Sequence, residues 1–316
     1  MTTGFSQAST RVHDKLFKLG DADSYNEVVD LFDKYTEQFT RHLPAPMMAM
    51  AAVQANQCIL DIGTGTGIVA LEVARSLSEG GRIVGIDLSD GMLATARAKA
   101  EKEGLAEQTE FLKMDAEALQ FEDNAFDNVL SLYALRHFPN PEKAVAEMHR
   151  VLKPGGSVVV AVGSRPELLS RGGVVAMSRR ITSIIRRLAG RELAACEFLD
   201  QLVNQHIPEI VNSDTAHWTA DRHGFTGSVR GLLESAGFTD IDSTWRGQYS
   251  IIESPEEFWE LQMTFSSLAR KRIGQAEDSV VDGLKNEFIS TCEGVLARKG
   301  RLVYQSGAAI ISAVKP

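Results

Sequence analysis

A glycine-rich turn and an acidic residue that follows it are the residues of this chain best suited to bind a nucleoside. The turn, Ile59-Leu60-Asp61-Ile62-Gly63-Thr64-Gly65-Thr66-Gly67, follows an apolar run and precedes the helical pattern IVALEVARSL. Glycines let the backbone approach a ligand closely, because a β-carbon would clash there. Asp87 ends the next apolar run, RIVGID, where its carboxylate can accept hydrogen bonds from both hydroxyls of a ribose. The pattern predicts a site for an adenosyl ligand.

A nicotinamide dinucleotide is the first alternative ligand for this arrangement. Its fingerprint, G-x-G-x-x-G/A, counted from Gly63 and Gly65, requires a small residue at position 68, where this chain has Ile68. The third glycine is Gly67, and the resulting G-x-G-x-G pattern suits a ligand without a pyrophosphate. The turn therefore favours an adenosyl ligand over a dinucleotide.

Five motifs follow one another in a characteristic order: DIGTGTG, VGIDLS with Gly91-Met92-Leu93, FLKMDAEALQF, FDNVLSLYALRHF and RVLKPGG. In order and spacing they resemble class I S-adenosylmethionine-dependent methyltransferases, particularly the methyltransferase type 11 group, which includes the ubiquinone and menaquinone biosynthesis enzymes. The resemblance covers residues 55–165 closely. It implies a seven-stranded sheet whose last strand is antiparallel, with S-adenosylmethionine across the carboxyl ends of the central strands.

The resemblance also implies roles for individual residues at the methionine end of that cofactor. Gly63, Gly65 and Gly67 would pass under the methionine moiety. Asp61 would lie near its amino group, and Ser131, at the end of the fourth strand, would line the side where the methyl group is transferred.

At the adenosine end, Asp87 would hold the ribose, while Leu88 and Met92 would flank the adenine. Asp115 and Ala116 would face the polar edge of the base. Asp115 has an alternative role as the cap of the short segment that follows it. Within this ordered series of motifs we favour recognition of the base.

The segment SLYALRHF at 131–138 is the natural place for the chemistry of the acceptor. A sulfonium already carries a reactive methyl group, so the protein has mainly to align a nucleophile and to take its proton. His137 is a candidate general base, because a histidine titrates near neutral pH. Its alternative role is a local bond to the backbone. Tyr133 is a second candidate, and its alternative role is to wall the pocket.

Three related activities fit the motifs less well. Nucleic-acid amino-methyltransferases would carry an Asn/Asp-Pro-Pro-aromatic tetrapeptide where this chain has SLYA, and arsenic methyltransferases need a cysteine pattern that Cys58, Cys196 and Cys292 do not provide. The quinone enzymes are closer, through RVLKPGGSVVVAV and ALRHF. Residues 161–164, AVGS, nevertheless lack the glutamate that their signature expects, and a long insertion follows. A quinone acceptor remains one option.

The insertion is basic. Residues 165–191 hold seven arginines and one acid, Glu167, and between 174 and 188 the apolar residues share one face of a predicted helix. Such a helix suits peripheral contact with an anionic membrane or an acidic substrate. The simpler interpretation, which we favour, is a lid helix with a solvated outer face.

Composition narrows the possible partners. The chain is 44% hydrophobic and 24% charged, as in globular proteins, and its net charge of −9 argues against a nucleic-acid substrate. The N-terminal residues lack an apolar signal segment, so we expect a cytoplasmic protein. The spacings of His206, His217 and His223 match no compact metal motif, and we expect no metal.

Strand and helix patterns alternate from residue 58 to 162, which predicts a Rossmann-like, doubly wound α/β sheet. We expect an N-terminal helical cover over 1–54. Its helical pattern begins near Ser24 and is broken by Pro44 and Pro46. The cofactor-binding core would span 55–164, a helical lid without strands 165–230, and the rest of the core 231–316. Predicted strands cover 58–61, 82–87, 109–115, 126–131, 157–162, 239–252 and 301–314.

These observations predict a methyltransferase that uses S-adenosyl-L-methionine and methylates an oxygen, carbon or nitrogen atom of a small, partly apolar acceptor. The acceptor would resemble a natural product or a quinol. Two alternatives stay open: a non-catalytic protein that binds S-adenosylmethionine, because the motifs report binding and not turnover, and an NAD(P)-dependent dehydrogenase.

Overall fold

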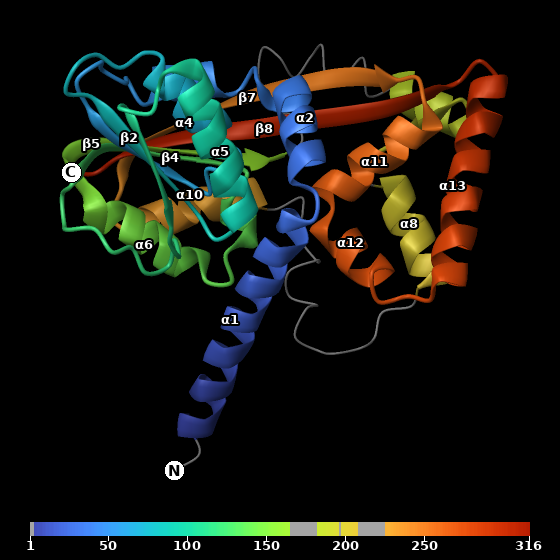
Figure 1. Cartoon of the computed structure of the whole chain (residues 1–316), viewed down its shortest axis with the longest axis horizontal. Coiled ribbons are helices and arrows are strands. Elements are labelled where there is room, and N and C mark those ends of the chain that lie inside the picture. Colours follow the sequence, from blue (N-terminus) through green and yellow to red (C-terminus); the bar gives the residue numbers. More distant parts are fainter. Residues whose placement is uncertain (1–2, 165–181, 196, 208–224) are drawn as a thin grey trace. The chain divides into compact units, whose positions relative to one another are not determined.

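The computed structural model describes residues 3–164, 182–195, 197–207 and 225–316. Its contacts divide the chain into two compact units (Figure 1). The first unit comprises residues 1–164, 223–244 and 309–316, and the second comprises 165–222 and 245–308.

Five parallel strands form the sheet of the first unit, in the order β3-β2-β1-β4-β5. On β1, Leu60 lies opposite Val84 of β2 and Val129 of β4. The predicted doubly wound sheet is confirmed, and the strand order reverses direction beside β1. The bounds are β1 Cys58–Ile62, β2 Arg82–Asp87, β3 Thr109–Lys113, β4 Phe126–Leu132 and β5 Leu152–Gly163.

Helices cover both faces of this sheet because its strands are apolar on both sides. Leu60 and Ile62 of β1 belong to a buried cluster with Met148 of α6 (Pro141–Val151) and Leu233 of α10 (Phe225–Ser235). The helices α4 (Ile68–Ala74) and α5 (Asp90–Glu103) pack against β2 and β3. Local residues define both ends of α5: Ser89 Oγ accepts a hydrogen bond from the Met92 N–H, and Gly104 ends the helix with φ +71°.

The C-terminal strands extend the sheet, and β8 (Arg301–Val314) is hydrogen-bonded to β5. The Gly155 N–H donates to the Lys315 carbonyl at 2.8 Å, which places the end of β8 beside the start of β5. The two strands are therefore antiparallel, as predicted for the last strand. β7 (Thr239–Ile252) also pairs with β8.

The sheet of the described residues has eight strands, one more than predicted. The additional strand is β6 (Glu192–Ala194), which pairs in parallel with Arg301–Val303 of β8. It lies in the segment for which the sequence predicted helices alone. A three-residue strand at a sheet edge is too short to show an alternating pattern.

The N-terminal helices begin earlier than the sequence predicted. α1 spans Thr3–Asn26, α2 spans Val29–Thr40 and α3 spans Pro44–Met50. The helical pattern is broken before Pro44, as the sequence predicted: α2 ends at Thr40, and Pro44 begins α3, where the missing N–H has no helical partner to lose. Pro46 does not break the helix, because it also lies in the first turn of α3.

The second unit contains α8 (Glu197–His206), α11 (Pro255–Phe265), α12 (Ser267–Ile273) and α13 (Asp278–Ala297). Phe258 and Trp259 of α11 are buried, and both pack on Phe288 of α13. These aromatic side chains are part of the buried core of the unit. Ser254 caps α11, since its Oγ accepts the Glu257 N–H at 3.2 Å.

The described part of the basic segment, residues 182–188, is helical. Its apolar side chains are solvent-exposed: Ile184, Ile185 and, at 85%, Leu188. The part of the predicted helix from 174 to 181 lies outside the described residues, so contact with a membrane stays a prediction. Among the described helices, none combines the length and the hydropathy needed to cross a bilayer.

Candidate functional site

The glycine-rich turn connects the carboxyl end of β1 to α4. Gly63, Gly65 and Gly67 all have positive φ, +70°, +54° and +86°, a conformation that favours glycine. The space around the turn is also restricted: a β-carbon on Gly63 would overlap that of Ala134, and one on Gly65 would lie 3.4 Å from the Phe32 ring of α2. Backbone conformation and close packing together require glycine here.

Asp61 lies at the end of β1 with 1% of its surface exposed. Thr64 Oγ1 donates to its Oδ2 at 2.7 Å, whereas Oδ1 is buried without a hydrogen-bond partner in the described part of the chain. Burial raises the pKa of Asp61 to about 7, and the nearby Asp87 carboxylate contributes in the same direction. A buried acceptor of this kind fits an ammonium group, which would supply both the missing donor and the balancing charge.

Asp87 ends β2 at the same edge of the sheet. Its Oδ2 accepts the Gly65 N–H and its Oδ1 accepts the Ser89 N–H, each at 3.0 Å. Burial raises the pKa of Asp87, although these backbone bonds favour the ionised form. Because each carboxylate oxygen can accept two hydrogen bonds, both oxygens keep capacity for a pair of hydroxyl donors. This arrangement suits a ribose.

Asp115, which follows β3, makes a local and a distant contact. Its Oδ1 accepts the Glu117 N–H at 2.9 Å, which is the capping bond that the sequence left open. Its Oδ2 forms an ion pair at 2.7 Å with Lys18 of α1, and Lys18 also lies 2.8 Å from Glu117 Oε2. These two carboxylates raise the pKa of Lys18 against the opposing effect of burial. A ligand at this edge would meet Lys18 beside Asp115.

The remaining residues that were predicted to bind the cofactor are buried or half-buried. Met92 and Ala116 are buried, and Leu88 is half-buried after β2. Ser131 is fully buried, and its Oγ donates to the Ile62 carbonyl of β1 at 3.0 Å. The structure thus places Ser131 within the sheet, where it joins β4 to β1.

The loop after β4 carries Tyr133 and His137. Tyr133 has φ +60°, which is strained for a bulky residue, and its N–H donates to the Ala161 carbonyl. Burial raises the pKa of its hydroxyl, so the phenol stays protonated at neutral pH. Tyr133 is therefore better suited to line the pocket or to donate a hydrogen bond than to act as a base.

His137 ends the short 3₁₀ helix Leu135–His137. Its Nδ1 lies 2.9 Å from Asp21 Oδ2 of α1, and its ring packs edge-on against Tyr25, with centroids 5.6 Å apart. It follows β4, whose carboxyl end lies at the same edge of the parallel sheet as that of β2, which ends at Asp87. The structure thus brings His137 and Asp87 to one edge of the sheet.

The first helix supplies residues that the sequence analysis did not select: Lys18, Asp21 and Asn26. Asn26 Oδ1 accepts from Ser89 Oγ at 2.7 Å and from the Gly91 N–H at 3.0 Å, which fixes the end of α1 over the start of α5. The positions 14, 18, 21 and 25 share one helical face, and that polar spacing was the available signal.

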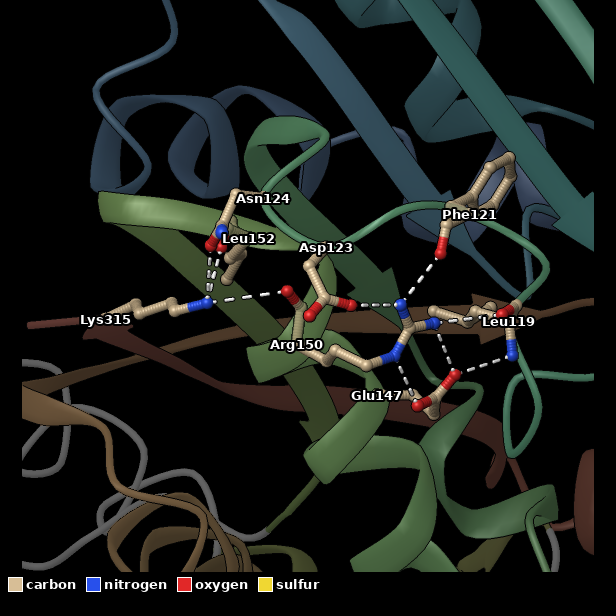
Figure 2. A network of polar contacts seen from close by, with 8 residues as sticks. All are labelled: Leu119, Phe121, Asp123, Asn124, Glu147, Arg150, Leu152 and Lys315. Atoms are coloured by element: carbon tan, nitrogen blue, oxygen red, sulfur yellow. Dashed lines mark hydrogen bonds and ion pairs between the residues drawn. The ribbon is translucent and has the colours of Figure 1, made fainter.

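A polar network centred on Arg150 of α6 supports the connection between Asp115 and β4 (Figure 2). Arg150 donates to the carbonyls of Leu119 and Phe121 and forms ion pairs with Glu147 and Asp123, both at 2.8 Å. Glu147 in turn accepts the Leu119 N–H, and Arg150 lowers the pKa of this carboxyl. The network holds this connection on α6.

Comparison with known proteins decides the family. The model of a methyltransferase domain matches residues 60–160. The ubiquinone/menaquinone biosynthesis C-methyltransferase UbiE of Klebsiella pneumoniae is 30% identical over 194 residues, which cover 61% of this chain and 70% of that protein. The chain belongs to the class I S-adenosylmethionine-dependent methyltransferases. UbiE of Cronobacter sakazakii is 33% identical over 188 residues, which cover 58% of this methyltransferase and 74% of the relative.

Solved structures agree with this fold. The YcgJ protein of Bacillus subtilis superposes with a TM-score of 0.53 at 20% identity, over 87% of this methyltransferase and 98% of that chain. The BH2331 protein of Bacillus halodurans C-125 gives the same TM-score at 22% identity, over 87% and 99%.

The methyl donor of this enzyme is S-adenosylmethionine, and the described residues fit it. Asp61 would offer the amino group its buried Oδ1, which has no hydrogen-bond partner in the described part of the chain, and Asp87 would offer acceptors to the ribose. When bound, the donor supplies a methyl group on a positively charged sulfur, and that sulfur retains the bonding electrons. Because burial raises the pKa values of both carboxylates, a cationic ligand would relieve their mutual repulsion.

Proposed function

We propose that this methyltransferase acts on a small, partly apolar, hydroxylated aromatic acceptor of the quinol type, and that His137 accepts the proton that the acceptor loses. The observation that carries the proposal is the contact of His137 Nδ1 with Asp21, after β4, at the edge of the sheet where β2 ends at Asp87, the predicted ribose ligand. The relatives named as C-methyltransferases of quinone biosynthesis support this choice of acceptor.

The acceptor class follows from the need for a base. A phenolic oxygen, or a ring carbon activated by a hydroxyl group, becomes an adequate nucleophile when its proton is removed. An amine that is already neutral needs alignment and desolvation more than a base. A histidine at this edge of the sheet is therefore more useful for carbon or oxygen methylation.

The experiment measures methyl transfer from labelled S-adenosylmethionine to hydroquinones, phenols and primary amines of matched size. We expect turnover with the hydroxylated aromatics and little with the amines. His137→Gln should lower kcat for the productive acceptor by about 100-fold or more, the usual contribution of a general base. Binding of S-adenosylhomocysteine should change little, because Asp61 and Asp87 are intact.

Two results would contradict the proposal. Full activity of His137→Gln would show that His137 is not the base. Turnover confined to amines would show that the acceptor is not a hydroxylated aromatic compound. Binding of S-adenosylhomocysteine without transfer to any acceptor would favour the non-catalytic alternative. His149→Gln is a matched control, because His149 lies on α6, packs against Phe238 and does not belong to the proposed site.

A further inference from the structure

Asp21 is a buried carboxylate that the cofactor site does not use. It lies on α1, its side chain is 8% exposed, and its Oδ2 is 2.9 Å from His137 Nδ1. The two residues are 116 positions apart in the sequence, so the contact depends on how α1 lies against the loop after β4.

The position of α1 is fixed by contacts on either side of Asp21. One helical turn earlier, Lys18 forms ion pairs with Asp115 and Glu117. One turn later, Tyr25 packs edge-on against the His137 ring. Asp14, one turn before Lys18 on the same face, accepts a hydrogen bond from Asn140 Nδ2 at 2.9 Å. The carboxylate of Asp21 is thus held in place from both directions along the helix.

A carboxylate at Nδ1 determines which nitrogen of a neutral imidazole carries the proton. An ionised carboxylate only accepts hydrogen bonds, so the proton must reside on Nδ1, and Nε2 then keeps its lone pair. The same carboxylate stabilises the imidazolium that forms when Nε2 takes a proton. Tyr25, which packs edge-on against the ring, limits its rotation.

We propose that Asp21 is the positioning residue for His137: it holds the imidazole with Nδ1 protonated and Nε2 available to the acceptor, so that the N-terminal helix completes the methyl-transfer site. This inference rests on the proposed function of His137. In the step itself, the bond between the acceptor and the methyl group forms as the bond between methyl and sulfur breaks. The proton of the acceptor passes to Nε2, and the electron pair of the broken bond stays on sulfur.

The test compares Asp21→Asn, Asp21→Glu and the control Asp14→Asn, which alters the same face of α1 without touching His137. Nitrogen-15 NMR of the histidine side chains, in protein without donor or acceptor, reports the tautomer directly. His137→Gln identifies the signal. We expect the wild type and Asp14→Asn to hold the Nδ1-protonated form, and Asp21→Asn to lose this preference.

Activity provides the second readout. Asp21→Asn should lower kcat by about 10- to 100-fold with less than a threefold change in the KM of the acceptor, whereas Asp21→Glu should recover part of the loss. Asp14→Asn should retain the wild-type kcat. Calorimetry with S-adenosylhomocysteine should give similar affinities for all three variants, which would show that the helix remains in place.

The possible failures are distinguishable. If His137→Gln is inactive while Asp21→Asn keeps both the tautomer and the wild-type kcat, the positioning role is wrong and the base role stands. If His137→Gln is fully active, the proposed base role is wrong, and the positioning role falls with it. If Asp21→Asn and Asp14→Asn lower kcat equally, with unchanged tautomers, α1 is a structural cover and Asp21 has no positioning role.

Discussion

Replacing Asp61 with asparagine should stabilise the folded protein above neutral pH and weaken its binding of S-adenosylhomocysteine. Asp61 is buried at the end of β1, and its pKa is raised from 3.8 to about 7. Asparagine has nearly the same shape and can still accept the hydrogen bond of Thr64, but it has no charge to bury. It also lacks the negative charge that an incoming ammonium group requires.

The size and sign of the effect follow from linkage. Between pH 3.8 and 7 the folded state holds a proton that the unfolded state has released, so the free energy of unfolding falls as the pH rises through this window. Each pH unit corresponds to about 1.4 kcal/mol, which gives an upper bound of about 4 kcal/mol above pH 7 and about 1.6 kcal/mol at pH 5. The advantage of Asp61→Asn should therefore grow by about 2–3 kcal/mol between pH 5 and pH 8.

Urea unfolding of the wild type and Asp61→Asn at pH 5, 6, 7 and 8 measures this difference. Asp282→Asn, on the exposed face of α13, is a matched control that should follow the wild type. Calorimetry with S-adenosylhomocysteine in two buffers of different ionisation enthalpy adds an independent check. We expect the wild type to release a proton on binding near pH 7 and Asp61→Asn to release little.

Parallel unfolding curves for the wild type and Asp61→Asn over the whole range would refute this reasoning, because Asp61 would then not be the group that titrates. Unchanged binding of S-adenosylhomocysteine by the variant would refute the assignment of Asp61 to the amino group. Some pH dependence should remain in the variant, since burial also raises the pKa of Asp87.

Two further predictions concern the support of the site. Gly63→Ala combines a left-handed φ with an overlap on Ala134 and should lower the free energy of unfolding by about 2–4 kcal/mol. Urea unfolding should show partial recovery in the double variant with Ala134→Gly, and no recovery would contradict the packing argument. Arg150→Met removes the bonds that join α6 to the connection before β4 and should cost about 1–3 kcal/mol. Arg150→Lys should recover less than half of this loss in the same assay, since lysine lacks the forked donors, and full recovery would show that charge alone matters.

Short-range patterns were sufficient to predict most of the sheet. The predicted strands coincide with β2, β7 and β8 at both ends, because each is bounded by residues that end or interrupt the strand pattern. The ends of α5 are also set locally, since the cap Ser89 and the terminator Gly104 act within a few residues of themselves. The extra strand β6 was missed, because it exists through its pairing with β8.

The residues of the candidate site also fall into two groups: those that the sequence indicates and those whose orientation only the fold decides. Asp61, Asp87 and the glycines could be selected from the sequence, because each follows a strand directly and the carboxyl ends of parallel strands meet at one edge. Ser131 follows the same rule, yet its hydroxyl is bound to Ile62 within the sheet. The direction of a side chain at a strand end is decided by its neighbours on the adjacent strand.

The sequence by itself determined the family, the donor and the order of the central elements, since these depend on motifs whose residues are close together in the chain. The tertiary structure alone decided the contributions of α1. Lys18 meets Asp115 across 97 positions, and Asp21 meets His137 across 116. Helical periodicity states which residues share a face but not what that face contacts. What the face contacts is decided only when the helix packs, and in this protein packing brings the Asp21 carboxylate to His137.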